Sequence, residues 1–284
     1  MASPRSNTQM FALRQPPPEH LELAGGRYRL ARVFKHDFFA ATCLYQRDVP
    51  ATPPEAVPRV VVKFCRNQSF WGLPLDWIGR FLAGHEEAIY GVLRGLAGVP
   101  RWMGRLSPTS CAVEYIDAKP LDHLPSPPAG FFSRLRELFD AIHARGVAYG
   151  DTNKRSNILI GLDGRPFLVD YQIAIRRRDD LPWPVNAILR RAVAYLADKD
   201  IYHLYKHKRR LCPNEMTEEE LVLSYSRSWL HRLHRRLTKP YRALRRAFLA
   251  RQYRKGQLLS PTAALEDHHQ PEKAAWRGDG HKRI

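Results

Sequence analysis

Long hydrophobic runs and paired cysteines are both missing from this sequence. Nowhere do about 18 apolar residues follow one another, as a membrane-spanning helix would require. The first residues, Met1–Pro17, lack the apolar core of a secretory signal peptide. The four cysteines, Cys43, Cys65, Cys111 and Cys212, have no CxxC spacing, which argues against a zinc site or a disulfide scaffold. We therefore expect reduced cysteines and a cytoplasmic protein.

Acidic residues are scarce as well. The chain has 46 Lys and Arg against 28 Asp and Glu, so its formal net charge is +18. Hydrophobic residues make up 44% of the 284 positions, which is enough for the core of one globular domain. The start is polar and rich in proline, and the end mixes Pro, His, Gly and charge. This composition predicts disordered tails at 1–26 and 257–284, with the domain at 27–256.

Two carboxylates and one carboxamide lie on turns between short apolar runs in the middle of the chain. The runs Ile158–Ile160 and Pro166–Val169 are joined by an Asp-Gly turn, a strong hairpin signal. If the strands pair around it, Asn157 and Asp170 lie at neighbouring ends of the ribbon, and Asp151 lies on the loop just before. Oxygen ligands of this kind suit Mg²⁺, and a carboxylate at 151 could accept the proton of an attacking hydroxyl. The stretch therefore predicts phosphoryl-transfer chemistry.

The segment before this loop has helical spacing. Leu135, Leu138 and Ile142 recur at helical intervals within Phe131–Ala144, and Gly146 follows as a stop signal. Taken singly, each of the three polar residues could be an ordinary turn or strand-end residue, because Asn and Asp favour turns. Their joint spacing favours a functional site over that alternative.

At these positions the chain resembles the protein-kinase-like superfamily. The catalytic-loop pattern H-R-D-x-x-x-x-N and the D-F-G pattern are matched by Tyr149-Gly150-Asp151 with Asn157, and by Asp170-Tyr171-Gln172. The loop is one residue longer than the pattern, and Gln stands where Gly is usual. The resemblance implies that Asp151 is the catalytic base, that Asn157 and Asp170 hold Mg²⁺, and that ATP is the phosphoryl donor.

Residues upstream match further parts of such a site. The run Val60–Lys63 reads as a buried strand that ends in a lysine, which the resemblance assigns to the α/β-phosphates of ATP. A helix expected at about 75–96 carries Glu86 on its inward side together with Tyr90. Glu86, rather than Glu87, is therefore the expected partner of Lys63. The alternative is a solvated surface pair.

The resemblance also implies a hinge and a loop that covers the phosphates. The strand and turn at Cys111–Leu121 would form the hinge, with backbone groups near Glu114 and Ile116 binding adenine. The covering loop should lie near 30–44, but this stretch contains no glycine, and Cβ atoms obstruct a backbone cradle. Lys35 would then contact phosphate through its side chain, or it is an ordinary turn lysine.

Within the superfamily the chain is most similar to bacterial lipopolysaccharide core kinases of the Kdo and heptose type and to small atypical Ser/Thr kinases. The shared features are the compact size, the glycine-poor first loop, the Gly98-Val-Pro100 sequence and the lack of a long activation segment. The implied fold is α+β and bilobal. A small antiparallel sheet lobe with one helix is expected at about 27–113, and a mainly helical lobe at about 117–256.

The reaction implied by this resemblance is transfer of the γ-phosphoryl group of ATP to a hydroxyl of a lipopolysaccharide-core sugar or similar envelope glycolipid. Lys154 or Arg155 would steady the transferred group. An atypical Ser/Thr protein kinase is the alternative within the superfamily. A pseudokinase scaffold is favoured by the glycine-free loop and Gln172, whereas the retained Lys63 and Asp151 argue for an enzyme.

Positive charge is concentrated toward the end of the chain. Between His203 and Lys255 there are 15 Lys and Arg against four Asp and Glu. The cluster Lys206–Arg210 precedes two expected basic amphipathic helices within 217–254. Their apolar stripe consists of Leu230, Leu233, Leu237, Tyr241, Leu244 and Phe248.

Three interpretations of these basic helices are open. The stripe could pack on the large lobe with solvated arginines, or the helices could contact an anionic membrane surface on the inner face of the cytoplasmic membrane. Nucleic-acid binding is the least favoured, because no recognition motif accompanies the charge. An aromatic segment at Phe70–Phe81 could likewise enter a bilayer edge or shape an acceptor site, but we expect it to pack over the small lobe.

Overall fold

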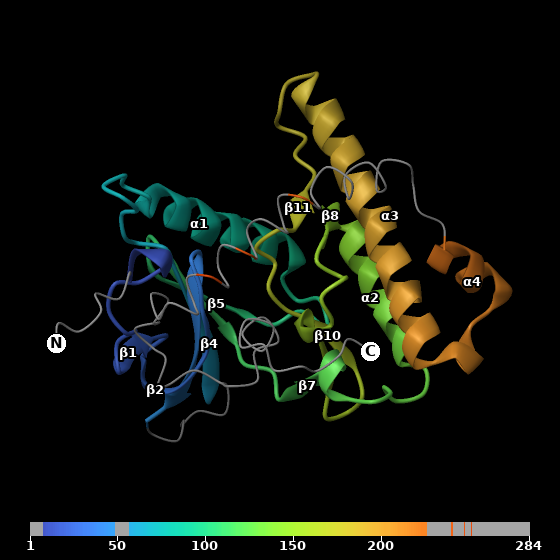
Figure 1. Ribbon diagram of the computed structural model, residues 1–284, viewed down its shortest axis with the longest axis horizontal. Coiled ribbons are helices and arrows are strands. Elements are labelled where there is room, and N and C mark those ends of the chain that lie inside the picture. The colour runs from blue at the N-terminus through green and yellow to red at the C-terminus, as the bar shows by residue number, and fades with distance from the viewer. Residues whose placement is uncertain (1–7, 49–56, 226–239, 241–246, 248–250, 252–284) are drawn as a thin grey trace. The chain divides into compact units, whose positions relative to one another are not determined.

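The computed structural model describes residues 8–48, 57–225, 240, 247 and 251 (Figure 1). Contacts divide the chain into two compact units. Among the described residues, the sheet unit comprises the chain up to Gly84 and Met103–Tyr115, together with residues 240, 247 and 251. The helical unit comprises His85–Trp102 and the described chain from Ile116 to Tyr225.

The sheet unit is built on a six-stranded sheet with the order β1-β2-β3-β4-β6-β5. Its strands are β1 (His20–Leu23), β2 (Gly26–His36), β3 (Ala40–Arg47), β4 (Arg59–Cys65), β5 (Trp102–Ser107) and β6 (Ser110–Glu114). Residues alternate between the two faces of β4, so Val60 and Val62 are fully buried while Lys63 is partly exposed on the other face. The buried face packs with Tyr28 and Tyr45 in one core. The strand predicted at Val60–Lys63 is confirmed, but it does not end in Lys63 and continues to Cys65.

The start of the chain differs from the tail expected at 1–26. A short 3₁₀ helix, η1 (Thr8–Met10), precedes β1 in the sheet. The fully buried guanidinium of Arg66 donates hydrogen bonds to the carbonyls of Gln9 (2.9 Å), Phe11 (3.0 Å) and Phe38 (3.1 Å). A buried charge requires such partners, and this need fixes the early segment against the hairpin between β2 and β3.

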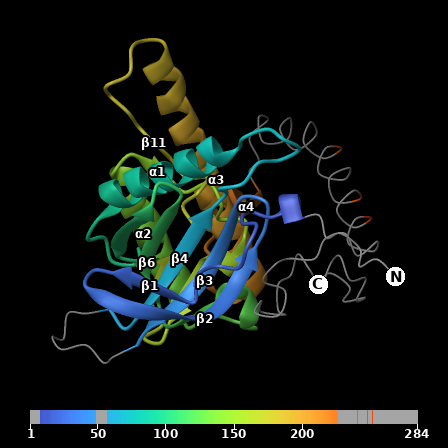
Figure 2. The same ribbon diagram turned by 90° about the vertical axis from the view of Figure 1, so that its left-hand side faces the viewer.

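The helical unit contains α2 (Phe131–Ala144), α3 (Val185–Leu211) and α4 (Glu218–Tyr225) (Figures 1 and 2). Its shorter elements are β7 (Ala118–Pro120), η2 (Leu121–His123), β8 (Val147–Ala148), η3 (Arg155–Asn157), β9 (Ile158–Gly161), β10 (Pro166–Leu168), β11 (Ile175–Arg176) and η4 (Pro213–Glu215). Helix α1 (Asp76–Leu93) runs from the sheet unit into the helical unit. The α+β class with one sheet-based and one mainly helical part is as predicted.

The predicted elements around the loop that carries Asp151 are confirmed. Helix α2 has the expected bounds and buries Leu135, Leu138 and Ile142. Strands β9 and β10 pair antiparallel, with Ile158 opposite Leu168. The Asp-Gly turn therefore forms the hairpin that the sequence indicates.

Part of the C-terminal basic region is used inside the helical unit. Lys208 is buried and its ammonium binds both carboxylate oxygens of Glu220, at 2.8 and 2.6 Å. Thr217 and Glu220 form a reciprocal capping box at the start of α4, as the sequence predicts for a helix start here. Arg209 stacks over Tyr225 at 3.7 Å. The apolar stripe from Leu230 to Phe248 lies outside the described residues. What the predicted basic helices contact therefore stays a prediction.

The aromatic segment Phe70–Phe81, which follows β4 and includes the first turns of α1, does not pack as predicted. Phe70 does pack, edge-on against Phe38 and near the Arg66 guanidinium. However, Trp71, Trp77 and Phe81 are exposed, because α1 buries its other face, on which Ala83 and Ile89 lie. The exposure of the segment was wrongly predicted.

All four cysteines are free, and three of them are buried. None of the described helices is long and apolar enough to cross a membrane.

Candidate active site

The loop between α2 and β9 brings two of the predicted residues into direct contact. The side-chain amide Nδ2 of Asn157 donates a hydrogen bond to Oδ2 of Asp151 at 2.8 Å. Backbone bonds from Lys154 to Asp151 (2.9 Å) and from Asn157 to Lys154 (3.1 Å) fold the six-residue step between them into tight turns. The residue that makes this loop longer than the family pattern is therefore accommodated by the 3₁₀ helix η3.

Asp170 enters the same place from the end of the hairpin. The amide of Val169 donates to the carbonyl of Asn157 at 3.1 Å, so the backbones of the two predicted metal ligands are neighbours. Asp170 has φ of 64°, in the left-handed region that non-glycine residues seldom adopt. Backbone strain of this kind is concentrated at functional sites.

Two buried tyrosines hold these groups together. Tyr149 donates its hydroxyl proton to the Val169 carbonyl at 2.5 Å, and its ring meets that of Tyr171 edge to face at 5.2 Å. Tyr171 also packs against Tyr90 of α1, at 5.2 Å. Burial is the main cause that raises the pKa of Tyr149, followed by Tyr171 and then by the negative charges of Asp170 and Asp151. The Tyr149 hydroxyl thus ties the loop that carries Asp151 to the residue before Asp170.

A residue that the sequence analysis missed, Asp200 of α3, anchors the loop. Its fully buried carboxylate accepts hydrogen bonds from the amides of Tyr149 (2.8 Å) and Gly150 (2.9 Å) and from the hydroxyl of Thr152 (2.5 Å). Gly150 has φ of 79°, which allows successive amides to point at one acceptor. Asp200 thus holds the backbone of Tyr149 and Gly150 before Asp151 and the side chain of Thr152 after it.

A signal for Asp200 exists in the sequence. Val193, Asp200 and Leu204 recur at helical spacing and share the buried face of α3. A carboxylate on an apolar helix face must find buried hydrogen-bond donors. Here these donors are two amides and one hydroxyl of the loop around Asp151.

His207 is a second contact between α3 and the loop. Its Nε2 lies 2.9 Å from the carbonyl of Thr152, so Nε2 carries the proton, and its buried Nδ1 has no hydrogen-bond partner. Burial, with further contributions from Lys206 and Arg155, lowers the pKa of His207 to about 4. The folded protein therefore holds this histidine neutral.

We expect the stability of the protein to fall with acidification through His207. Because the folded pKa of about 4 lies below the unfolded value of 6.5, the unfolded chain binds the proton first, and stability is lost as pH falls from about 6.5 toward 4. The loss attributable to this group between about pH 7.5 and about pH 5 should be about 2 kcal/mol. Urea unfolding at the two pH values measures it, with His207→Gln expected to show the smaller pH dependence. Equal pH dependence in both proteins would contradict this role.

The predicted lysine and glutamate lie in different units. Lys63 stands on β4 between Thr42 of β3 and Cys111 of β6. Glu86 is buried on α1, on the side that also buries Tyr90, as the sequence indicates. Their pairing stays a prediction. The same applies to adenine binding at Glu114, which ends β6, and at Ile116, which begins the next part of the helical unit.

The tip of the glycine-free loop is closed by the side chain of Asp37. The carboxylate Oδ1 of Asp37 accepts the amides of Phe39 (2.8 Å) and Ala40 (3.0 Å). Lys35 pairs with the other oxygen of Asp37 at 2.5 Å. Burial works against ionisation, but Lys35 and the two amides hold the pKa of Asp37 below its ordinary value. Amides that would face a phosphate are thus bound to a carboxylate, which favours the turn-lysine interpretation of Lys35.

The donor chemistry of the loop and hairpin fits a magnesium ion that also binds phosphate. Because Nδ2 of Asn157 faces Asp151, its carbonyl Oδ1 is the atom that could bind a metal, beside the carboxylate of Asp170. No group of three or more His, Cys, Asp and Glu that could hold a metal occurs among the described residues. Mg²⁺ commonly needs only one or two protein carboxylates when substrate phosphates complete its shell.

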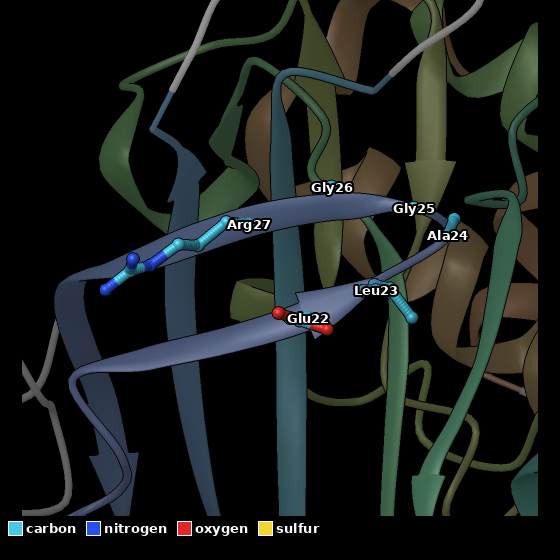
Figure 3. A pocket seen from close by; sticks show the side chains of 6 residues that line it. All are labelled: Glu22, Leu23, Ala24, Gly25, Gly26 and Arg27. Carbon is cyan, nitrogen blue, oxygen red and sulfur yellow. The ribbon is translucent and has the colours of Figure 1, made fainter.

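A hollow elsewhere in the sheet unit does not form such a site. It lies at the turn between β1 and β2 and is lined by six consecutive residues, Glu22 to Arg27 (Figure 3). In the part of the chain that the structure describes, only these residues line it, and none of them is a predicted catalytic or metal-binding residue.

Sequence comparisons find no matching family model and no similar curated protein. Among solved structures, the chain is similar to the Rio2 kinase–ADP/Mg²⁺–phosphoaspartate complex from Chaetomium thermophilum, with 15% identity and a TM-score of 0.48. It is also similar to the Rio2 kinase of that organism, with 17% identity and a TM-score of 0.44. These similarities cover 66% and 64% of this chain, and 58% and 56% of the two kinases.

The chain spans little more than half the length of either similar structure. The roles of individual residues therefore rest on the contacts described above.

Proposed function

We propose that this chain is an ATP-dependent phosphotransferase that acts on a hydroxyl group. The observation that carries the proposal is the convergence of Asp151, Asn157 and Asp170 on one place in the helical unit. The side chain of Asn157 donates a hydrogen bond to Asp151, and its backbone carbonyl accepts one from Val169. The buried carboxylate of Asp200 holds the backbone of the same loop. A structural turn would need neither a buried carboxylate anchor nor a strained aspartate.

The side chains then have separate tasks. Asp151 orients the acceptor hydroxyl and accepts its proton as the oxygen forms a bond to the γ-phosphorus, while the bond from that phosphorus to ADP breaks. Asn157 and Asp170 would hold Mg²⁺, which neutralises phosphate charge when it is bound. Lys154 is placed on the same loop and could steady the transferred group.

The nucleotide contacts form the second part of the proposal. Lys63 would bind the α/β-phosphates with Glu86 as its partner, and backbone groups near Glu114 and Ile116 would bind adenine. The buried state of Glu86 supports this role, because a buried carboxylate needs a cationic or hydrogen-bonding partner.

The acceptor is either a sugar of an envelope glycolipid or a Ser/Thr hydroxyl of a protein. The sequence resemblance favours the sugar. The two kinases of similar fold lend no support to a lipopolysaccharide substrate. Labelled ATP offered with lipid extract and, separately, with a protein substrate such as casein would distinguish the two by the product that carries label.

A pseudokinase is the second candidate, and the loop tip favours it. The carboxylate of Asp37 accepts hydrogen bonds from the amides of Phe39 and Ala40. In a phosphate-binding loop these amides would instead be free to bind the phosphates. If the purified protein showed no Mg²⁺-dependent turnover with lipid, protein or small-alcohol acceptors, this candidate would replace the phosphotransferase.

Comparing Asp170→Gly with Asp170→Ala separates the effect on ATP turnover from the effect on stability. Asp170→Gly and Asp170→Ala are both expected to lower Mg²⁺-dependent ATP turnover by at least about 100-fold, because the metal-facing carboxylate is gone. Glycine accepts the φ of 64°, whereas alanine keeps the strain. The glycine variant should therefore be more stable than the alanine variant by about 1 kcal/mol in urea unfolding. Wild-type turnover in Asp170→Gly would refute the metal role.

A further inference from the structure

The first turns of α3 project from the helical unit. Figures 1 and 2 both show the start of α3 and the strand-to-helix segment before it extending beyond α2. No residue of α3 before Val193 is buried. We call residues 177–192 the α3 projection.

Large apolar side chains lie at the tip of the α3 projection. Trp183 is 83% exposed and Ile188 is 63% exposed, and Val185 between them is exposed as well. Exposing several such groups on one narrow element gains nothing for folding. Grouped exposed apolar residues of this kind mark contact surfaces.

Arginines lie on the same element as this apolar tip. Four exposed arginines, Arg177, Arg178, Arg190 and Arg191, share the α3 projection with only two acids. Arg178 pairs with Asp180 and Arg190 with Asp179, each at 2.7 Å. Two positive charges remain in excess, so the α3 projection is complementary to an anionic surface.

An apolar stripe leads from the tip toward the catalytic loop. Ile188, Ala192 and Leu196 are four residues apart and share one face of α3. A methyl branch of Leu196 lies 3.7 Å from where a Cβ on Gly150 would stand. Helical rise places Ile188 roughly 12 Å beyond Leu196 along the axis. Ile188 therefore lies roughly 12 Å along the helix axis from the residue that packs near Gly150.

We propose that the α3 projection docks on an anionic lipid bilayer. Trp183 and Ile188 enter the interface between headgroups and acyl chains, and Arg177 and Arg191 bind lipid phosphates. A tryptophan with arginines beside it suits this boundary, because its ring is amphipathic and the guanidinium groups stay at the phosphate level. Docking would hold a membrane-bound acceptor next to Asp151. That last consequence rests on the proposed phosphotransfer, whereas the docking does not.

A second copy of the chain fits this surface less well. A stable protein interface buries about 800 Å² on each partner, in a broad patch with an apolar centre and a polar rim. The α3 projection offers a few apolar side chains on a narrow element, with charge on its flanks. A bilayer accepts such an element without requiring shape complementarity.

Vesicle binding by the full-length, nucleotide-free protein tests the docking. Co-sedimentation with phosphatidylcholine vesicles containing phosphatidylglycerol measures the partition coefficient of wild type, Trp183→Ala, Ile188→Ser, Arg191→Ser and Leu162→Ser. We expect Trp183→Ala to lower it at least about tenfold and Arg191→Ser about fivefold. Leu162 is the matched control, since it is 83% exposed on the β9–β10 turn of the same unit. Its substitution should leave binding unchanged.

Several results would overturn the proposal. Equal partitioning of wild type and Trp183→Ala would do so even if other basic segments bind the vesicles. An equal loss in Leu162→Ser would show that the effect is not specific to the α3 projection. A change from dimer to monomer in Trp183→Ala, seen by light scattering without a change in vesicle binding, would assign the surface to a second copy instead. Circular dichroism of each variant confirms that it is folded.

Discussion

Replacing Asp151 with Asn is expected to lower the rate of phosphotransfer by about 10²–10⁴-fold. The amide has nearly the same shape, and its remaining oxygen can still accept the hydrogen bond from Asn157 that is 2.8 Å long in the wild type. It cannot accept the proton of the attacking hydroxyl. The loss should therefore fall on kcat, with little change in the KM for ATP. Steady-state ATP turnover with Mg²⁺ and the acceptor measures both constants.

Asp163→Asn is the matched control for this substitution. Asp163 lies on the β9–β10 turn of the same unit, where its carboxylate contacts only Arg165 among the described residues. Its replacement should leave kcat unchanged. Turnover of Asp151→Asn at the wild-type rate would remove Asp151 from the chemistry and would favour the pseudokinase.

Asp200→Ala is expected to destabilise the folded protein by about 3–5 kcal/mol. The substitution leaves the amides of Tyr149 and Gly150 and the Thr152 hydroxyl without their acceptor, and each such buried donor costs about 1–3 kcal/mol. The loop around Asp151 would also lose its fixed position, and a shift of about 1 Å can lower the rate about 100-fold. Urea unfolding and ATP turnover of the folded fraction measure the two effects.

The neighbouring Asp198 provides the control for Asp200. It lies on the same helix, two residues earlier, but is exposed. Asp198→Ala should change the free energy of unfolding by no more than about 0.5 kcal/mol. If Asp200→Ala were as mild as this control, the carboxylate would not be the anchor of the catalytic loop.

Membrane docking and phosphotransfer make separate demands on the chain. The α3 projection is joined directly to the segment that follows Asp170, so both tasks depend on one stretch of the helical unit. Variants at Trp183 leave Asp151 and Asp170 untouched. The two proposals can therefore fail independently.

Local patterns in the sequence predicted the elements that carry the site. The apolar spacing in 131–144 predicted α2, and an Asp-Gly turn predicted the β9–β10 hairpin, because helix periodicity and turn chemistry act over a few residues. The hairpin then places Asn157 and Asp170 side by side by geometry alone. The sequence also placed Asp151 within reach of this pair, but it did not predict the hydrogen bond between Asn157 and Asp151.

Contacts between distant segments were not predicted. Arg66 binds carbonyls of residues 9 and 11, more than 50 positions away, and so orders a segment that composition marked as a tail. Trp77 was expected to be packed but is exposed, because aromatic content alone does not say which face of α1 is buried.

A local contact was missed as well. The carboxylate of Asp37 accepts hydrogen bonds from amides two and three residues later, and so closes the turn of a loop that has no glycine.

By itself, the sequence determined helix α2, the β9–β10 hairpin and the residue types of the proposed site, since these follow from periodicity, turn residues and motif spacing. Only the tertiary structure decided what holds the catalytic loop and what the chain leaves exposed. Asp200 became an anchor because folding places its buried carboxylate about 50 residues along the chain from the amides that it binds. Trp183 is left exposed, and the start of α3 extends past α2 (Figure 1). Burial depends on which segments meet in space, and local sequence does not specify that.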